Sequence, residues 1–490
     1  MYTGSTLHVS ASLRTAFMFT IFGAKHRHCD GTTRRDFLVA GALRLGGMGI
    51  GGLTLADLNR IEAATGIRNS HKAVINIHLD GGPPQMDTID LKPNAPAEIR
   101  GEFSPISTRL PDFQISELMP QMAAMADRFV FLRSLIGAEG RHDAFQCQSG
   151  FPMSNLQSIG GRPAMGSIVS KLRGSAEDVA PSFVDLMQGR PLVRHSARPG
   201  FLGPSYKPFR PDISRWFQRP LEDGMKNELA AQGANHTTSL SLNTSISANR
   251  LANRSQLLGG LDRLRHEVDS SGMMDALDTF NQQAAGILLS GKFAAAMDLE
   301  SEDSRVLKKY TPAASRIQKF TTAENHFAMR KLLLARRLVE AGVRCVSVSF
   351  SDFDTHSSNF KRMRHMLPIL DHGLCALVND LEERGMLDDV SIVAWGEFGR
   401  TPKINAKAGR DHWPRVAPAI MAGGGIRAGQ VIGATDRSAG TATSRPLHYQ
   451  DVMATLYHNL GIDAAATTVQ DPTGRPQYLL DRGKPIQELV

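Results

Sequence analysis

The most constraining feature of this chain is a series of short apolar segments, each followed by a loop with acidic or histidine side chains. The first segment, residues 73–79 (AVINIHL), runs into Asp80-Gly81-Gly82-Pro83-Pro84. The segments 344–350 (RCVSVSF) and 390–395 (VSIVAW) have the same β-branched, apolar character. Short apolar runs that stop at Gly or Pro are typical of buried strands. The chain is therefore expected to contain a sheet whose strands are largely shielded from water.

Helical patterns alternate with these strands. Further strands are expected at 129–132, 182–186 and 417–421, and helices at 165–172, 327–339, 360–384 and 449–460. Strands that alternate with helices predict a parallel sheet covered on both faces. The expected fold class is α/β, doubly wound, with a mostly parallel sheet and helices on both sides.

Residues 65–490 are expected to form one domain of this kind. Residues 200–250 are rich in Pro, Asn, Ser and Thr and have weak periodicity, which is typical of a loop. From 251 to 341 the pattern is helical, and Leu257, Leu261 and Leu264 share one face. We therefore expect a loop and helical insertion at about 200–330.

The N-terminal segment has the pattern of a twin-arginine export signal. Thr33-Arg34-Arg35-Asp36-Phe37-Leu38 is followed by a Gly-rich, weakly apolar stretch from Val39 to Leu58. Arg44 interrupts that stretch, which makes it a poor membrane-spanning helix. Small residues at Ala63 and Ala64 indicate cleavage nearby, so residues 1–64 are interpreted as signal and leader. The alternative is a first amphipathic helix of the domain.

An export signal of this type implies a partner and a location. The twin-arginine translocase would bind the precursor during export, and the product would be periplasmic or extracellular. The translocase carries folded proteins, which suits a protein that acquires a metal or cofactor first. No later uncharged apolar run is long enough to span a bilayer, so no stable membrane span is expected. Either Met1 or Met18 could be the start.

Charge and cysteine content argue against three classes of protein. The 56 Lys and Arg residues against 48 Asp and Glu give a net charge of +8, which is mild for 490 residues. Without a Lys/Arg run or basic residues interleaved with aromatics, nucleic acid is not an expected partner. The four cysteines are scattered and lack CxxC spacing, which disfavours both a disulfide framework and a thiolate zinc site.

Acidic and histidine side chains collect where the predicted strands end. In chain order they are Asp80, Asp354, His356, Glu397, Asp411 and His412, with Arg400 among them. Ligands in open α/β sheets bind outside the carboxyl ends of the strands, so these side chains are expected to lie together. Mixed carboxylate and imidazole ligands suit Zn, Mn or Fe, and carboxylates alone suit Mg or Ca. A divalent metal at this edge would polarise a phosphoryl or sulfuryl oxygen.

Each of these groups also has a purely structural interpretation. Asp80 could cap a turn before Gly81. Asp354 and His356 could cap the helix expected near Phe360. Glu397 and Arg400 could form a surface ion pair. Asp411 and His412 could stabilise the loop beside Trp413 by hydrogen bonds.

Five motifs resemble the family known as domain of unknown function 1501, a group of exported bacterial proteins abundant in planctomycetes. The motifs are CDGTTRRDFL (29–38), HLDGGPPQMDTIDLKP (78–93), SFSDFDTHSSNF (349–360), LDDVSIVAWGEFGRTPKIN (387–405) and GRDHWP (409–414). This family is placed with the alkaline phosphatase and sulfatase superfamily. The resemblance implies a doubly wound sheet with a metal site at its carboxyl edge.

The resemblance also implies metal-ligand roles for particular residues. Asp80, the pair Asp354 and His356, and Glu397 match ligand positions, and His412 resembles the last histidine ligand, with Asp411 beside it. The segment 140–152 (GRHDAFQCQSGFP) is similar in placement to the segment that carries the sulfatase nucleophile.

Two departures from the superfamily pattern affect the expected chemistry. Cys147 is not part of a sulfatase nucleophile motif, and Phe398 stands where a second histidine ligand belongs. His142 or Asp143 could compensate for that histidine, and both are candidate catalytic residues.

Two functions therefore remain open. The first is an exported metal-dependent hydrolase of a phosphate or sulfate ester, acting on a small ester or on a sulfated or phosphorylated glycan, with Zn, Mn, Ca or Mg. Water would be its nucleophile, with Thr88 as a weak exception, and Arg400 or Arg141 would stabilise the transferring anion. The second is a non-catalytic exported binding module that keeps the fold for a polysaccharide or envelope partner.

The export signal gives the first testable prediction. Replacing Arg34 and Arg35 together with Lys should leave the precursor in the cytoplasm, because the translocase recognises the arginine pair itself. Cell fractionation followed by immunoblotting measures this. A double-lysine variant that is exported as well as the wild type would exclude the twin-arginine interpretation.

Overall fold

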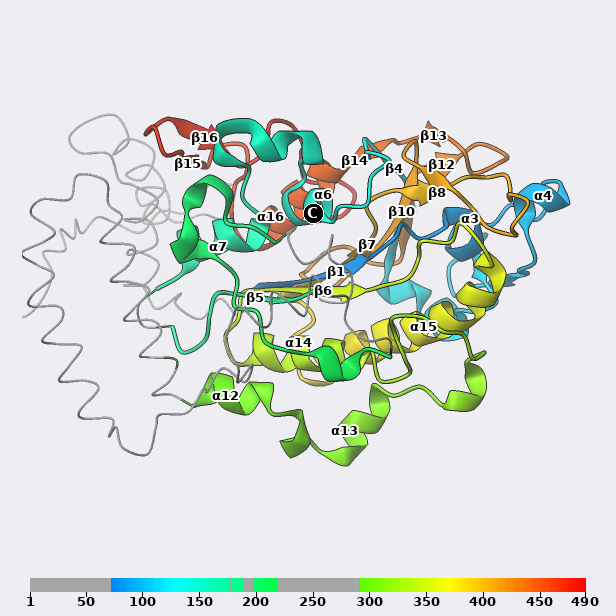
Figure 1. Ribbon diagram of the computed structural model, residues 1–490, viewed down its shortest axis with the longest axis horizontal. Helices are drawn as coiled ribbons and strands as arrows, with labels where there is room; N and C mark the ends of the chain where they lie inside the picture. Colours follow the sequence, from blue (N-terminus) through cyan, green and yellow to red (C-terminus); the bar gives the residue numbers. More distant parts are fainter. Residues whose placement is uncertain (1–71, 176–177, 188–196, 219–286, 288–290) are drawn as a thin grey trace, which may run out of the picture. The chain divides into compact units, whose positions relative to one another are not determined.

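The computed structural model describes residues 72–175, 178–187, 197–218, 287 and 291–490 (Figure 1). The predicted leader, residues 1–64, lies outside these ranges, as do Leu257, Leu261 and Leu264. None of the helices within these ranges is long and apolar enough to cross a membrane.

A mixed, mostly parallel sheet organises the described residues. Its eight strands are β1 (Ala73–Leu79), β4 (Val130–Ile136), β5 (Phe183–Leu186), β6 (Cys345–Phe350), β7 (Val390–Trp395), β10 (Ala417–Ala422), β11 (Gln430–Ile432) and β14 (Leu447–His448). The strand order is β11-β4-β10-β7-β1-β6-β5, and β14 also pairs with β4. Within this sheet β10 alone is antiparallel to its neighbours.

The register of β1 aligns the ends of three central strands. Leu79 lies opposite Phe350 of β6, and His78 lies opposite Trp395 of β7. All three strands are parallel, so their carboxyl ends reach the same edge of the sheet. The loops that follow Leu79, Phe350 and Trp395 therefore begin side by side.

The alternation of β1 divides its side chains between two cores. Ile75, Ile77 and Leu79 belong to one core, and Val74 belongs to the other. The first core packs under α5 (Pro120–Ala124), α14 (Arg330–Glu340) and α15 (Asn359–Glu383). The second packs under α6 (Phe145–Ser149), α7 (Met165–Arg173) and α16 (Tyr449–Asn459). Figure 1 shows α14 and α15 on one side of the sheet and α6, α7 and α16 on the other, which confirms the predicted doubly wound fold.

The remaining strands and several short helices lie outside the central sheet. Outside the sheet are α3 (Gln85–Thr88), α4 (Ala97–Arg100), η3 (Ala126–Arg128), η4 (Met153–Gly160), and the hairpins β2 (Pro105–Ser107) with β3 (Gln114–Ser116), β8 (Gly399–Arg400) with β9 (His412–Trp413), β12 (Ala434–Thr435) with β13 (Ala442–Ser444), and β15 (Thr468–Gln470) with β16 (Pro476–Tyr478).

The described part of the predicted insertion holds only short helical turns. They are η5 (Gly200–Leu202), η6 (Pro204–Tyr206), η7 (Ser214–Trp216), α12 (Lys292–Met297), η8 (Leu299–Ser301), α13 (Ser304–Lys309) and η9 (Ala314–Arg316). The predicted helix 327–339 begins at Arg330 instead, because residues 326–329 form turns. The Asn325 side chain accepts a hydrogen bond from the Phe327 backbone N–H at 2.8 Å, which holds that stretch in a turn.

A buried ion pair joins the β8–β9 hairpin to α3, the short helix that follows β1. Arg410 donates from Nε and Nη2 to the two carboxylate oxygens of Asp87, at 2.8 and 3.0 Å. Asn359, the first residue of α15, donates to the same carboxylate at 2.8 Å. All three side chains are buried. This network joins the loops that follow β1, β6 and β7.

The network gives a stability prediction. Asp87→Ala leaves the Arg410 guanidinium buried without its charge partner, so the free energy of unfolding should fall by about 3–5 kcal/mol. Urea unfolding followed by circular dichroism measures the change. Asp388→Ala, at an exposed aspartate, is the control and should change the value by no more than about 0.5 kcal/mol. Equal stability of the two variants would contradict the role given to the pair.

Candidate metal centre

Five loops meet at the carboxyl edge of the sheet. They follow β1, β4, β6 and β7, and the fifth is the β8–β9 hairpin. Together they bring two groups of potential ligands within reach of each other. One group is partly exposed and the other is buried.

The outer cluster consists of His142, Asp354, His356 and His412. One ligand atom from each lies within 4.8 Å of the others. Asp354 Oδ1 is 3.1 Å from His356 Nε2 and 3.6 Å from His412 Nε2. Asp354 Oδ2 is 3.3 Å from His142 Nε2. Three imidazoles therefore surround one carboxylate.

Hydrogen bonds on the far side of two rings fix their tautomers. Nδ1 of His356 lies 2.6 Å from Asp411 Oδ1, and Nδ1 of His412 lies 3.0 Å from the Gly140 carbonyl oxygen. An ionised carboxylate and a carbonyl only accept, so each Nδ1 carries the hydrogen. In the neutral rings both Nε2 lone pairs then point into the cluster. Histidines that bind metals have this arrangement, with the second ring nitrogen bonded to a carboxylate or a carbonyl.

The two inward nitrogens fit one cation. The Nε2 atoms of His356 and His412 are 3.0 Å apart. Two lone pairs at that distance repel each other unless a proton or a cation lies between them. Two ligands of one tetrahedral zinc ion, with bonds of 2.0–2.1 Å, are about 3.3 Å apart. The donors and their spacing therefore suit a transition metal or zinc.

The inner cluster consists of His78, Asp80 and Glu397, and all three side chains are buried. His78 Nε2 is 3.4 Å from Glu397 Oε2. Neither ring nitrogen of His78 has a hydrogen-bond partner among the described residues. Buried polar groups are rarely left in that state. A cation held by this cluster would satisfy the imidazole and offset the buried carboxylates.

His142 connects the two clusters. Its Nδ1 lies 2.9 Å from Glu397 Oε1, while Nε2 faces Asp354. Burial lowers the pKa of His142, but hydrogen bonds and charges from Asp354 and Glu397 outweigh this and raise it to about 9. The ring also packs against Phe398, with centroids 5.2 Å apart. An imidazole from another loop therefore lies beside Phe398.

Both central carboxylates are held in the charged form. Burial raises the pKa of Asp354, but the charge of His142 and the hydrogen bond from Arg400 outweigh this and hold it well below its usual range. Burial likewise raises the pKa of Glu397, and the hydrogen bond from His142 and the charge of His78 outweigh that effect. Charged carboxylates are the form that binds cations.

Two residues with unusual backbone angles allow the loops after β1 and β6 to approach each other. Gly81 has φ of +106°, and a Cβ there would lie 2.2 Å from the Asp354 backbone nitrogen. Its N–H donates to Glu397 Oε1 at 3.1 Å. Asp352 has φ of +88°, an uncommon conformation for a residue with a side chain. Strain of this kind is found where a loop must place a functional side chain, here Asp354.

Arg400 has a different place from the one predicted. Its side chain is fully buried. It donates to the carbonyl oxygens of Gly81, Gly82 and Arg410 and, at 2.8 Å, to Asp354 Oδ1. With four bonds inside the protein, Arg400 does not reach a substrate anion. It is a positioning residue that orients Asp354.

Asp411 and Asp143, which were also predicted as site residues, have supporting roles, and Cys147 of the same region is a buried thiol. Asp411 is bonded to His356 and to Asn405 Nδ2, so it supports a ligand from outside the outer cluster. Asp143 is buried and accepts from the Phe145 backbone N–H at 2.6 Å, which caps the start of α6. Burial raises the pKa of the Cys147 thiol well above its usual value.

His78 is the ligand candidate that the sequence argument missed. It precedes Asp80 by two residues, so a strand places both on the same side. That spacing was a usable signal. Its partner Glu397 is 319 positions away, and only the parallel pairing of β1 with β7 brings them together.

Comparison with known proteins identifies one family. The model described as "Protein of unknown function (DUF1501)" matches residues 71–490. No curated protein matches the sequence.

Several solved structures are similar in outline. The PsFucS1 sulfatase from Pseudoalteromonas sp. has 12% identity and a TM-score of 0.35, over 88% of this chain and 76% of that one. Ps i-CgsB has 11% identity and a TM-score of 0.35, over 80% and 72%. The phosphonate monoester hydrolase of Agrobacterium radiobacter has 12% identity and a TM-score of 0.31, over 85% and 77%. Scores this low carry no conclusion about activity.

The support that Asp411 gives to His356 can be tested directly. Asp411→Asn keeps the shape of the side chain but removes the charge that orients and polarises the ring. Affinity for Zn²⁺ should fall by roughly 10–100-fold, measured by competition with a chromogenic chelator. Asp388→Asn, at the opposite end of β7, should bind as the wild type does. Unchanged affinity in Asp411→Asn would show that this carboxylate does not support a ligand.

Proposed function

We propose that this chain, which belongs to the DUF1501 family, is an exported metal-dependent hydrolase of phosphate or sulfate esters. The observation that carries the proposal is the pair of inward-facing Nε2 atoms of His356 and His412 beside Asp354. Hydrogen bonds to Asp411 and Gly140 hold both rings in that orientation.

The residues present fit two divalent ions. The outer cluster would hold one ion through His356, His412 and Asp354, and the inner cluster would hold another through His78, Asp80 and Glu397. Mixed nitrogen and oxygen donors favour Zn or Mn over Mg or Ca. Bound ions supply charge stabilisation for a phosphoryl or sulfuryl group and lower the pKa of water.

The protein's own side chains limit the choice of nucleophile. Thr88 is buried, and its hydroxyl donates to the Pro84 carbonyl oxygen at 2.9 Å. Cys147 is buried, with its thiol pKa raised, so little thiolate forms. Neither side chain is available for attack, and water is the nucleophile that remains.

The transferring anion needs a positive contact that Arg400 cannot provide. Arg141 is exposed and lies between Gly140, whose carbonyl accepts from His412, and the cluster residue His142. We assign the anion contact to Arg141, since its exposed side chain belongs to the loop that carries His142 and a guanidinium can bind two oxygens of a phosphate or sulfate.

One observation favours the second candidate, a non-catalytic binding module. Of the two side chains considered as nucleophiles, the Thr88 hydroxyl is hydrogen-bonded inside the protein and the Cys147 thiol is buried with a raised pKa. A chain that uses its metal sites for structure or for binding a glycan would have no need of a nucleophile. Metal content and turnover distinguish the candidates when they are measured on the same preparation.

The metal-dependent activity has a specific test. His412→Ala removes a ligand of the outer cluster, so metal affinity should fall by at least the roughly 10–100-fold typical of lost supporting contacts. Turnover of 4-nitrophenyl phosphate or sulfate should fall with it. Elemental analysis, circular dichroism and the two assays are run on wild type, His412→Ala and the control Lys407→Ala.

Lys407 is exposed, and its replacement should leave metal content and turnover unchanged. Full metal occupancy in His412→Ala would remove this histidine from the ligand set. A wild-type protein that holds metal but hydrolyses neither ester would favour the binding module.

A further inference from the structure

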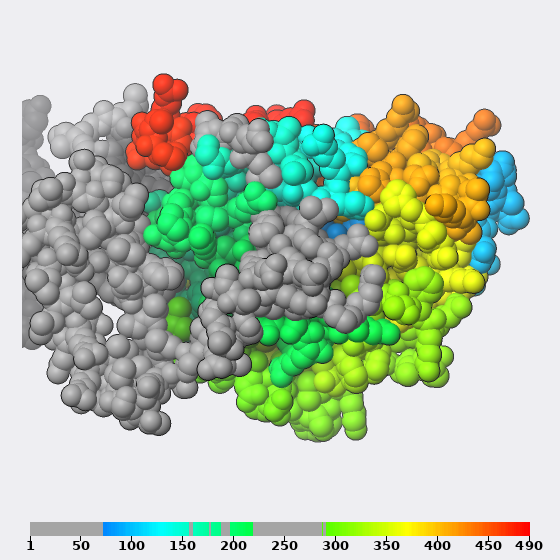
Figure 2. All heavy atoms as spheres, in the orientation of Figure 1, coloured from blue at the N-terminus to red at the C-terminus, as the bar shows by residue number. Residues whose placement is uncertain are grey.

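A pocket of about 620 Å³ adjoins the outer cluster. Three loop segments form it: residues 401–406 after β8, residues 411–415 around β9, and residues 436–441 between β12 and β13. Asp411 lines the pocket and at the same time binds His356 of the outer cluster. The two sites therefore share a wall. Figure 2 shows the orange part of the chain, which contains these loops, at the surface.

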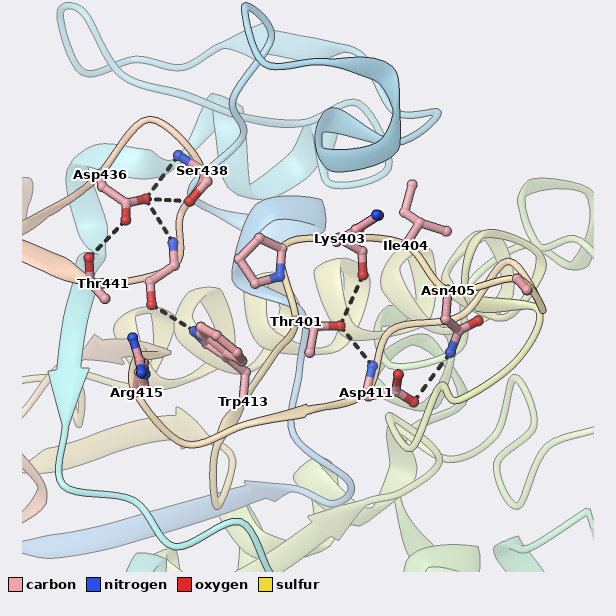
Figure 3. Close-up of a pocket in the computed structure, with 13 residues that line it drawn as sticks. Thr401, Lys403, Ile404, Asn405, Asp411, Trp413, Arg415, Asp436, Ser438 and Thr441 are labelled. Atoms are coloured by element: carbon pink, nitrogen blue, oxygen red, sulfur yellow. Dashed lines mark hydrogen bonds between the residues drawn. The ribbon is translucent and has the colours of Figure 1, made fainter.

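The walls of the pocket are fastened to one another (Figure 3). Trp413 Nε1 donates to the Gly440 carbonyl oxygen at 2.6 Å. The Asp436 carboxylate accepts from the backbone N–H groups of Ser438 and Gly440, both at 2.9 Å. Asp411 N–H donates to the Thr401 hydroxyl at 2.9 Å. A pocket held in shape in this way loses little entropy when a ligand binds.

Two cationic side chains of the pocket have no acidic partner in the described part of the chain. Lys403 and Arg415 are exposed, and within the described ranges neither has a carboxylate at ion-pair distance. The two carboxylates in the lining stay charged, but their oxygens already accept hydrogen bonds, Asp411 from His356 and Asp436 from its own turn. Lys403 and Arg415 are therefore the charged groups of the lining that can contact an anion.

Trp413 adds an aromatic surface to the charged lining of the pocket. The Arg415 guanidinium lies over the half-buried Trp413 ring, 5.3 Å from its centroid. Stacking on an indole holds a guanidinium flat, and its N–H edge can still bind a planar pair of oxygens. The lining also offers the hydroxyls of Thr401, Ser438 and Thr441 and the amide of Asn405. These groups suit a molecule with hydroxyls, a flat apolar face and a negative charge.

We propose that this pocket binds a sugar ring that carries its own sulfate or phosphate, next to the ester that is cleaved. The inference rests on the proposed function, because it takes the scissile ester to lie at the outer cluster. The substrate class is then a saccharide with at least two anionic groups. One anion meets the metal centre, and the other meets Lys403 and Arg415. The volume lies within the range of about 300–1,000 Å³ usual for small-ligand sites.

Binding to the metal-loaded full chain tests the proposal. Isothermal titration compares a disulfated lactose with unsulfated lactose on wild type, Lys403→Ala/Arg415→Ala and the control Lys407→Ala. Lys407 is an exposed lysine of the same loop that does not line the pocket. The double variant should bind disulfated lactose at least about tenfold more weakly, because it loses two charge-assisted contacts. Its affinity for unsulfated lactose should change less than twofold, and Lys407→Ala should match the wild type with both sugars.

The outcomes separate this proposal from the function on which it rests. Equal affinity of the double variant and the wild type for disulfated lactose would overturn the pocket assignment, even if the wild type hydrolyses aryl esters. So would a wild type that binds neither sugar. A wild type without aryl-ester turnover, whose binding of disulfated lactose depends on Lys403 and Arg415, would overturn the hydrolase and support the pocket as a saccharide site.

Discussion

The hydrogen-bonded register of β1 between β6 and β7 is the constraint on which the rest of the structure depends. It sets Leu79, Phe350 and Trp395 at one level, so that three loops start together. Each loop then needs only a few residues to place a ligand. A slip of one residue in β1 would turn His78 and Asp80 to the opposite face, away from Glu397. The inner cluster is therefore a consequence of strand pairing as much as of the residues themselves.

Much of this arrangement could be predicted from the sequence, and the part that could not has physical causes. The strands 73–79 and 390–395 were predicted with their observed bounds because continuous β-branched runs bounded by Gly or Pro are local signals. The roles of Arg400 and His142 depend on contacts across the fold. From the sequence, Arg400 was predicted to bind the transferring anion. In the structure it donates hydrogen bonds to Gly81 and Asp354, and no local sequence pattern connects these residues to Arg400. His142 was predicted as a catalytic residue, and the structure places it among the ligand candidates.

The carboxylates buried at this edge of the sheet need positively charged or hydrogen-bonding partners within the protein. Lys331 is fully buried and donates to both oxygens of Glu324 and to the Ser349 carbonyl oxygen. Its charge also interacts with Asp80. On the other side, Arg410 neutralises Asp87. Glu324, Asp80 and Asp87 thus each have a cation close by, and Glu397 contacts the ring of His142. Such pairs add little net stability, but the loss of one partner is costly, so the edge tolerates few changes.

The spread of the ligand candidates along the chain has a consequence for how the protein would behave in a cell. His78 and Glu397, which would hold the inner ion together, are 319 positions apart, and an unfolded chain cannot bring them to one ion. Any ion that occupies these clusters would therefore bind the native state alone and stabilise it by mass action. Thermal tolerance would then vary with the supply of the metal. The melting temperature of a fresh preparation would report the metal status of the cells that made it.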